Sequence, residues 1–365
     1  MIETHVVNAL LLPAYRQEQF FKVLNFINGL VAPSFLFCAG FALAITLNRR
    51  WDEYTGLRTS FWKYLSRIAF ILIVGYSLHL PFFSFRRLLA LTDESAWIAF
   101  FQSDILHVIA LTLALLLMTA VLVKKKERFF TVSMIIAFLL IFSAPIVCEG
   151  DYTQYPAWFR SFLTTQYRSP FPLFPWSAFL ICGAIVSFHF MKNKEQHREP
   201  LFILRLSFIA LGLTAGAIIA ELLPFTLYPN HDFWRASPEF FFVRLGIVIL
   251  FLTGLWWLEQ RQKPHEQKPG ITISPIPLFG QESLIVYVIH LLIVYGYTYK
   301  WSFVRQFSQT LNYSECMGLF IGLTVAMFLL AFIWHWLKSR NMRIAKWIQY
   351  AVFAAIVITF LVRTE

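Results

Sequence analysis

Apolar runs of about 20 residues recur along the whole chain, and they constrain the fold more than any other feature. A helix that crosses a bilayer needs about 20 apolar residues, because each residue adds only 1.5 Å. Ten runs are long enough to cross, near residues 29–47, 62–83, 105–123, 129–147, 172–191, 202–223, 239–257, 276–298, 317–337 and 346–362. Only 14% of residues are charged, against about a quarter in soluble domains. We therefore predict an all-α, polytopic transmembrane bundle.

The predicted bundle has ten full spans plus a partial first helix. Residues 1–12 resemble the end of a further span that is cut short, and we expect the true start of that helix to lie upstream. The whole chain, 1–365, is predicted to be one integral membrane domain, with 265–277 as its best-defined cytoplasmic loop. Pairs of glycines four residues apart, which favour close helix packing, predict contacts at Gly212/Gly216 and Gly318/Gly322.

Loops between the runs alternate in charge. One set is rich in bases, for example Arg49, Arg50, Arg58, Lys63 and the run 124–126, whereas the other set carries more acids. The positive-inside rule places the basic set in the cytoplasm, so we predict a multi-pass protein of the inner membrane. The net charge of +11 is then explained by topology and by the lipid bilayer as partner. Nucleic acid is not an expected partner.

Ionisable groups within apolar runs are costly, so each is a candidate for a site. Ser283, Tyr287 and His290 follow i, i+4, i+7 spacing and share one helix face. That face predicts either a site or a polar seam against a neighbouring helix. His5 lies in another apolar run, near its outer end, where an interfacial histidine is the alternative to a site residue.

The segment SDILHVIAL opens a span from the outer side. Asp104 and His107 are three residues apart, so the aspartate could orient the imidazole and raise its basicity. Alternatively, Asp104 serves as a helix N-cap, which we favour. Arg235, in an outer loop, either binds an anionic group or is a surface charge.

Familiar catalytic motifs are absent from the sequence. It contains no GxxxxGK, HExxH, GxSxG or CxxC pattern, and its four cysteines show no metal-ligand spacing. We therefore expect neither a metal cofactor nor nucleotide hydrolysis, zinc proteolysis or serine-elbow hydrolysis.

Four segments, in order, resemble blocks of the heparan-α-glucosaminide N-acetyltransferase-like family of membrane acyltransferases. They are NGLVAPSFLFCAGFAL (28–43), DILHVIAL (104–111), FPLFPWSAFLICGAIVS (171–187) and GQESLIVYVIHLLIVYG (280–296). The resemblance implies an 11-helix bundle that transfers an acetyl or other acyl group from cytoplasmic acyl-CoA to an extracytoplasmic sugar or amino sugar. The oligomeric state is left open by the sequence, with a homodimer as one alternative.

The resemblance assigns His5 to the superfamily histidine near the outer end of the first helix. Two departures are visible. Leu24 occupies the place of the histidine in the family's lysosomal enzyme, and the arginine upstream of the first-helix histidine is missing. For the general base we predict His5 first and His290 second, with His107 as a third outer-half imidazole and Tyr287 and Ser283 as hydrogen-bond donors. No residue is assigned to acyl-CoA, because the cytoplasmic bases are explained by topology.

A transporter or flippase with a polar central cavity is the rival interpretation. It predicts inverted repeats and broken helices at matching places in two halves, and no such repeat is evident in the sequence. A structural membrane protein without activity is a third interpretation, and it predicts that His107 and His290 tolerate alanine.

Overall fold

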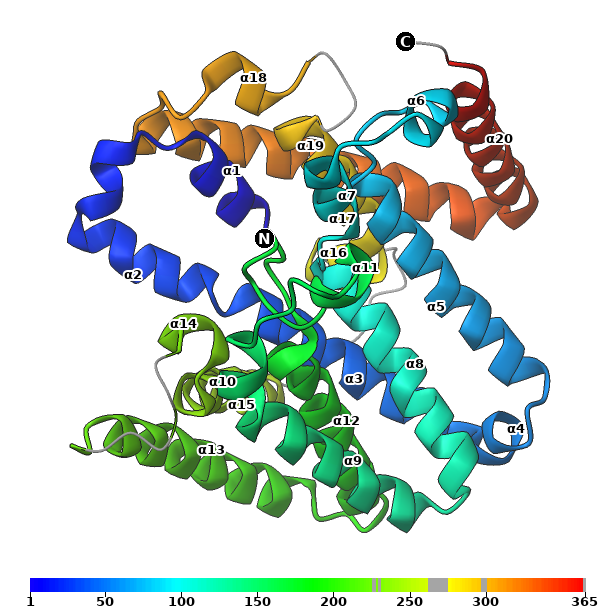
Figure 1. The fold of residues 1–365 in the computed structure, drawn as a ribbon. Helices are drawn as coiled ribbons and strands as arrows, with labels where there is room; N and C mark the ends of the chain where they lie inside the picture. Colours follow the sequence, from blue (N-terminus) through cyan, green and yellow to red (C-terminus); the bar gives the residue numbers. More distant parts are fainter. Residues whose placement is uncertain (225–227, 229–230, 262–274, 297–300, 364–365) are drawn as a thin grey trace. The chain divides into compact units, whose positions relative to one another are not determined.

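The computed structural model describes residues 1–365 apart from 225–227, 229–230, 262–274, 297–300 and 364–365. Its elements are helices (Figure 1). In chain order they are α1 Ile2–Leu10, a 3-10 helix Pro13–Gln17, α2 Gln19–Asn28, α3 Val31–Arg49, α4 Trp51–Thr55, α5 Thr59–Leu78, α6 Phe85–Leu89, α7 Glu94–Phe101, α8 Ile105–Val123, α9 Lys126–Phe142, α10 Ala144–Cys148, α11 Ala157–Arg160, α12 Leu173–Glu195, α13 Glu199–Glu221, α14 Phe233–Ala236, α15 Pro238–Arg261, α16 Pro275–Gln281, α17 Ser283–Tyr295, α18 Phe303–Phe307, α19 Tyr313–Arg340 and α20 Met342–Val362. The all-helical prediction is confirmed.

Eight helical stretches in the described part of the chain are long and apolar enough to cross a membrane. The number rises to nine if α16 and α17, which meet at an angle of 84°, form one broken span. The predicted run 129–147 is not among them, because the chain breaks at Ser143 into the 17-residue α9 and the short α10. Pro145 explains this break, since proline cannot continue the hydrogen-bond ladder of a preceding helix. The chain is thus an integral membrane protein with eight or nine supported spans.

Contacts divide the chain into two compact units. Unit 1 comprises Met1–Asn28, Leu78–Ala96 and Glu266–Glu365, and unit 2 comprises Gly29–Ser77 and Trp97–His265. The predicted loop 265–277 lies outside the described residues up to 274, and residues 275–277 begin α16.

Unit 2 is organised around backbone contact between α3 and α12. A Cβ atom on Gly40 would lie 1.8 Å from the carbonyl oxygen of Leu180, and one on Gly183 would lie 2.0 Å from that of Phe37. Only glycine permits so close an approach of two helices. The core of this unit includes large side chains with almost no exposure, among them Phe37, Phe179 and Leu180.

The structure contradicts the close packing predicted at the other glycine pairs. Within the described chain, a Cβ atom would meet nothing within 4 Å at any of the four positions, Gly212, Gly216, Gly318 and Gly322. The spacing of small residues identifies helices that could pack closely. It does not say which pairs do so.

Two basic loops of unit 2 lie together. This agrees with the positive-inside rule, which predicts that basic loops share one side of the membrane. The indole nitrogen of Trp51 donates to the carbonyl oxygen of Lys124 at 3.0 Å. Lys126 Nζ donates to Asn48 Oδ1 at 2.7 Å. These bonds join the end of α3 and the start of α4 to the junction between α8 and α9, so both loops lie at one end of the unit.

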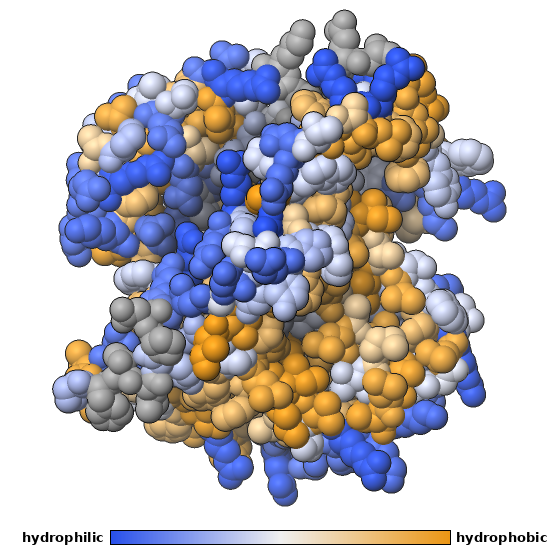
Figure 2. All heavy atoms as spheres, viewed as in Figure 1, coloured by the Kyte–Doolittle hydropathy of each residue, from blue (hydrophilic) through white to orange (hydrophobic). Residues whose placement is uncertain are grey.

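The outward faces of the long helices are apolar. Leu122 is 75% exposed, Phe208 65% and Phe251 66%. Figure 2 shows apolar residues gathered over the helices of unit 2, with polar residues along its lower edge, where interhelical loops lie. Helices that are apolar all round are typical of membrane spans.

Unit 1 holds α1 through backbone pairing as well as packing. The amide of Leu12 donates to Leu311 at 2.9 Å, and the amide of Leu311 donates to Leu10 at 3.1 Å. Leu10 and Leu11 have no exposed surface and join a core with residues of α16, α17 and α19. The start of the chain is thereby fixed against α17.

An ion pair with a buried carboxylate lies where α16 bends into α17. The Glu282 side chain is 4% exposed, and Lys338 Nζ of α19 lies 2.5 Å from its Oε1. His335 Nδ1 lies 3.2 Å from the same oxygen. The pair joins the bend to α19 and compensates a carboxylate that would otherwise be costly to bury.

Replacing Lys338 with methionine should therefore destabilise unit 1. Loss of Lys338 leaves the buried Glu282 carboxylate with His335 as its remaining partner, and because Lys338 is itself 29% exposed we expect a cost of about 2 kcal/mol. We expect the melting temperature in detergent to fall by about 5 °C. Lys346→Met, which removes an exposed lysine on α20, is the matched control and should melt like the parent protein. Equal melting of the two variants would contradict a stabilising role for the pair.

Candidate active site

Unit 1 brings two of the predicted histidines into contact. His5 of α1 and His290 of α17 have ring centroids 5.2 Å apart, with the ring planes tilted by 49°. They are 285 residues apart in sequence, and the packing of α1 against α17 places them together. We call these two side chains the histidine pair.

His290 is fully buried, and its tautomer follows from its hydrogen bond. Its Nδ1 lies 2.7 Å from the backbone carbonyl oxygen of Val286, one helical turn earlier. A carbonyl oxygen can only accept, so Nδ1 carries the proton and the neutral ring holds a lone pair on Nε2. That Nε2 atom is buried and has no hydrogen-bond partner in the described structure. Buried polar atoms are nearly always paired. The Nε2 atom of His290 is therefore available to accept a proton or a hydrogen bond from a bound molecule.

Two tyrosines flank the histidine pair. The hydroxyl of Tyr295 lies 3.1 Å from His5 Nδ1. The ring of Tyr287 packs edge-on against His290, with centroids 5.7 Å apart. Tyr287 shares a helix face with His290, as predicted, whereas Tyr295 was not predicted. Its only signal in the sequence is a hydroxyl near the end of an apolar run.

A further polar contact lies at the start of α1. Asn28 Nδ2 donates to Glu3 Oε1 at 3.3 Å, and Asn28 is buried. Neither residue was predicted as part of the site. An acid within the apolar run 1–12 was the available signal for Glu3. The contact attaches the end of α2 to the helix that carries His5.

Ser283 and Arg235 are not brought to the histidine pair by any described contact. Ser283 is the first residue of α17, about 10 Å along the helix axis from His290. Arg235 belongs to unit 2, where its guanidinium lies 3.5 Å from Asp232 and is half-exposed. These contacts match the surface-charge interpretation of Arg235.

Asp104 and His107 form a capping box at the start of α8. The Asp104 carboxylate accepts from the amide of Ile105 at 2.6 Å, and His107 Nδ1 accepts from the amide of Asp104 at 3.2 Å. The predicted N-cap role of Asp104 is confirmed. His107 is fully buried, and its ring packs on Tyr76 with centroids 4.3 Å apart. Since Nδ1 accepts, the neutral ring carries its proton on Nε2, the opposite tautomer to His290.

Gly75 makes room for that imidazole. A Cβ atom at this position would lie 3.0 Å from His107 Cε1. The His107 imidazole is therefore tightly packed within unit 2. Among the described residues, no group of three or more His, Cys, Asp or Glu side chains is arranged to hold a metal ion.

A protein-family model matches this chain. The model described as "Heparan-alpha-glucosaminide N-acetyltransferase, catalytic" matches residues 1–215, which is more than half of the 365-residue chain. The chain belongs to this N-acetyltransferase family. Comparisons with curated proteins and with solved structures gave no match.

Membership of the N-acetyltransferase family implies acetyltransferase activity and the use of acyl-CoA in a membrane protein. His5 and His107 lie within the matched residues, and His290 lies beyond them. The histidine pair thus joins one residue of the matched part to one outside it. Family membership does not favour the transporter interpretation.

Proposed function

We propose that this protein transfers an acetyl or other acyl group from acyl-CoA to the amine or hydroxyl of an extracytoplasmic sugar. The observation that carries the proposal is the unpartnered Nε2 of His290, buried beside His5 in a chain of an acetyltransferase family. We propose His290 as the general base and His5, hydrogen-bonded to Tyr295, as the second imidazole of the site. This order reverses the sequence-based preference for His5.

The proposed reaction needs one proton acceptor. As the acceptor nitrogen or oxygen attacks the thioester carbonyl, its proton moves to His290 Nε2 and a tetrahedral oxyanion forms. Collapse of the oxyanion breaks the carbon–sulfur bond, and the departing thiolate takes the proton from the imidazolium. Tyrosine hydroxyls beside the pair, on Tyr287 and Tyr295, are the proposed donors for the oxyanion.

We further propose ten full spans and a partial first helix in one membrane domain of the inner membrane. The basic loops then face the cytoplasm, where acyl-CoA is available. The 17-residue α9 is the tenth span in this proposal. Its length of about 26 Å, from 1.5 Å per residue, comes close to the thickness of the hydrocarbon core.

Acyl transfer can be tested with the purified chain in liposomes, labelled acetyl-CoA and a panel of amino sugars and neutral sugars. We expect labelled acyl-sugar to form. Tyr295→Phe should lower kcat/KM about tenfold, because it removes one hydrogen bond to His5. Tyr350→Phe is the matched control, since Tyr350 is exposed on α20, and it should leave the rate unchanged. A parallel assay uses labelled sugars with unlabelled acetyl-CoA. Entry of labelled sugar into the liposomes without acylation would contradict the enzyme and support a transporter.

A further inference from the structure

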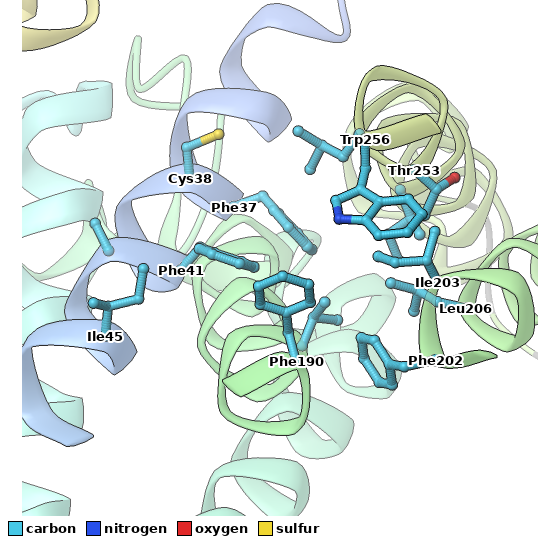
Figure 3. Close-up of a pocket in the computed structure, with 14 residues that line it drawn as sticks. Phe37, Cys38, Phe41, Ile45, Phe190, Phe202, Ile203, Leu206, Thr253 and Trp256 are labelled. Carbon is cyan, nitrogen blue, oxygen red and sulfur yellow. The ribbon is translucent and has the colours of Figure 1, made fainter. Parts of the chain in front are cut away.

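An apolar cavity of about 270 Å³ lies within unit 2, between α3, α12, α13 and α15. Figure 3 shows the rings of Phe37, Phe41, Phe190 and Trp256 around it. The rings of Phe41 and Phe190 lie 6.0 Å apart. Thr253 supplies the one side-chain hydroxyl of the lining, and that hydroxyl already donates to Leu250 at 3.0 Å. Cavities of this kind stay dry and take apolar ligands.

The cavity reaches the surface of unit 2. Cys38 and Ala42 of α3 line it, and both residues are exposed. Its lining helices are long and apolar enough to cross a membrane. The apolar molecule in greatest supply around such helices is the acyl chain of a lipid.

The helix ends next to the cavity are basic. Ile45 lies four residues from Arg49, or about 6 Å along α3, and Phe190 lies two residues from Lys192. These helix ends comprise the last seven residues of α3, α12 and α15, the first seven of α13, Arg50 and the loop 196–198. Together they hold seven basic and three acidic residues, a net charge of +4. The basic residues are Arg49, Arg50, Lys192, Lys194, Arg198, Arg205 and Arg261, and the acidic ones are Glu195, Glu199 and Glu259.

We propose that the cavity holds one acyl chain of an anionic glycerophospholipid, whose headgroup lies among these basic helix ends. The apolar lining fits the chain, and the positive charge fits the phosphate. Basic pockets between membrane helices bind anionic headgroups in this way. The binding site shares no residue with the histidine pair, and its test does not depend on the proposed acyl transfer.

Trp256 gives a direct readout of the bound chain. The purified full-length protein is placed in detergent micelles containing phosphatidylglycerol or phosphatidylcholine with a dibrominated acyl chain, because bromine quenches tryptophan on contact. Subtracting the signal of Trp256→Phe isolates this indole from the other tryptophans. We expect half-quenching at an approximately fivefold lower mole fraction of the anionic lipid, since one base beside the phosphate adds roughly this factor.

Matched variants separate the site from the general lipid surface. Ala42→Phe should fill the cavity and abolish the preference, whereas Leu255→Phe, on an exposed position of α15 outside the lining, should keep it. Lys192→Gln combined with Arg198→Gln should remove the preference without loss of quenching by phosphatidylcholine. This double variant carries the test alone if Ala42→Phe does not fold.

Three results would overturn the proposal. Equal half-quenching by the two lipids would show surface lipid only. A preference that survives both Ala42→Phe and the double variant would place the binding elsewhere. A free dibrominated fatty acid could also reach half-quenching at a lower mole fraction than phosphatidylglycerol. That result would show that the cavity binds a fatty acid in preference to a phospholipid.

Discussion

Replacing His290 with glutamine should lower kcat for acyl transfer by about 10²- to 10⁴-fold, the usual contribution of a positioned general base. Glutamine retains a polar side chain but has no atom that takes up a proton at neutral pH. The KM for acyl-CoA should change little, because the lost interaction acts in the transition state. Steady-state rates in liposomes, with the labelled assay above, measure both quantities.

A chemical role for His290 can be separated from a structural one. His290→Ala removes the ring, and added imidazole should restore part of the rate if the ring acts as a base. His197→Gln, in the exposed loop between α12 and α13, should be as active as the parent protein. Full activity of His290→Gln together with loss of activity in His5→Gln would assign the base to His5 instead.

Helix periodicity accounts for part of this site. Tyr287 and His290 are three residues apart, so their shared face and ring contact could be predicted from spacing alone. Tyr295, five residues after His290, falls outside the i, i+3, i+4 pattern and was missed. Its contact with His5 depends on where α1 packs, and no local pattern contains that information. The same is true of the histidine pair, whose two residues lie in helices far apart along the chain.

Composition predicted the class of fold, whereas local geometry decided the helix boundaries. Apolar runs identified the membrane helices because lipid requires their length and apolarity. The run 129–147 continues through Pro145, where the structure breaks α9 from α10. Hydropathy measures solvent preference and does not register the loss of a backbone donor at proline.

The spacing of glycines was the least reliable predictor of close helix packing. At the predicted pairs, including Gly212/Gly216, an added Cβ atom would meet no described neighbour, while Gly40 and Gly183, which have no second glycine four residues away, carry the close contact. Each of these two glycines lies opposite the backbone of the other's helix. This mutual contact joins two distant segments. It can be recognised only once it is known that α3 packs against α12.

Gly183→Leu should therefore destabilise unit 2 by more than about 4 kcal/mol, the range reached only by severe core disruption. Already the first side-chain carbon would lie 2.0 Å from the carbonyl oxygen of Phe37. Backbone atoms cannot rotate away as a flexible side chain can, so α3 and α12 must separate. We expect loss of the monodisperse peak in size-exclusion chromatography and loss of the thermal transition in detergent.

Gly212→Leu is the matched control, because it makes the same chemical change on α13 where a Cβ atom would meet no described neighbour. It should melt close to the parent protein. Separation of α3 from α12 would also move Phe37 away from Phe190 and open the wall of the apolar cavity. A Gly183→Leu protein as stable as Gly212→Leu would rule out the backbone contact between α3 and α12. It would then also remove the basis for a cavity shaped by these two helices.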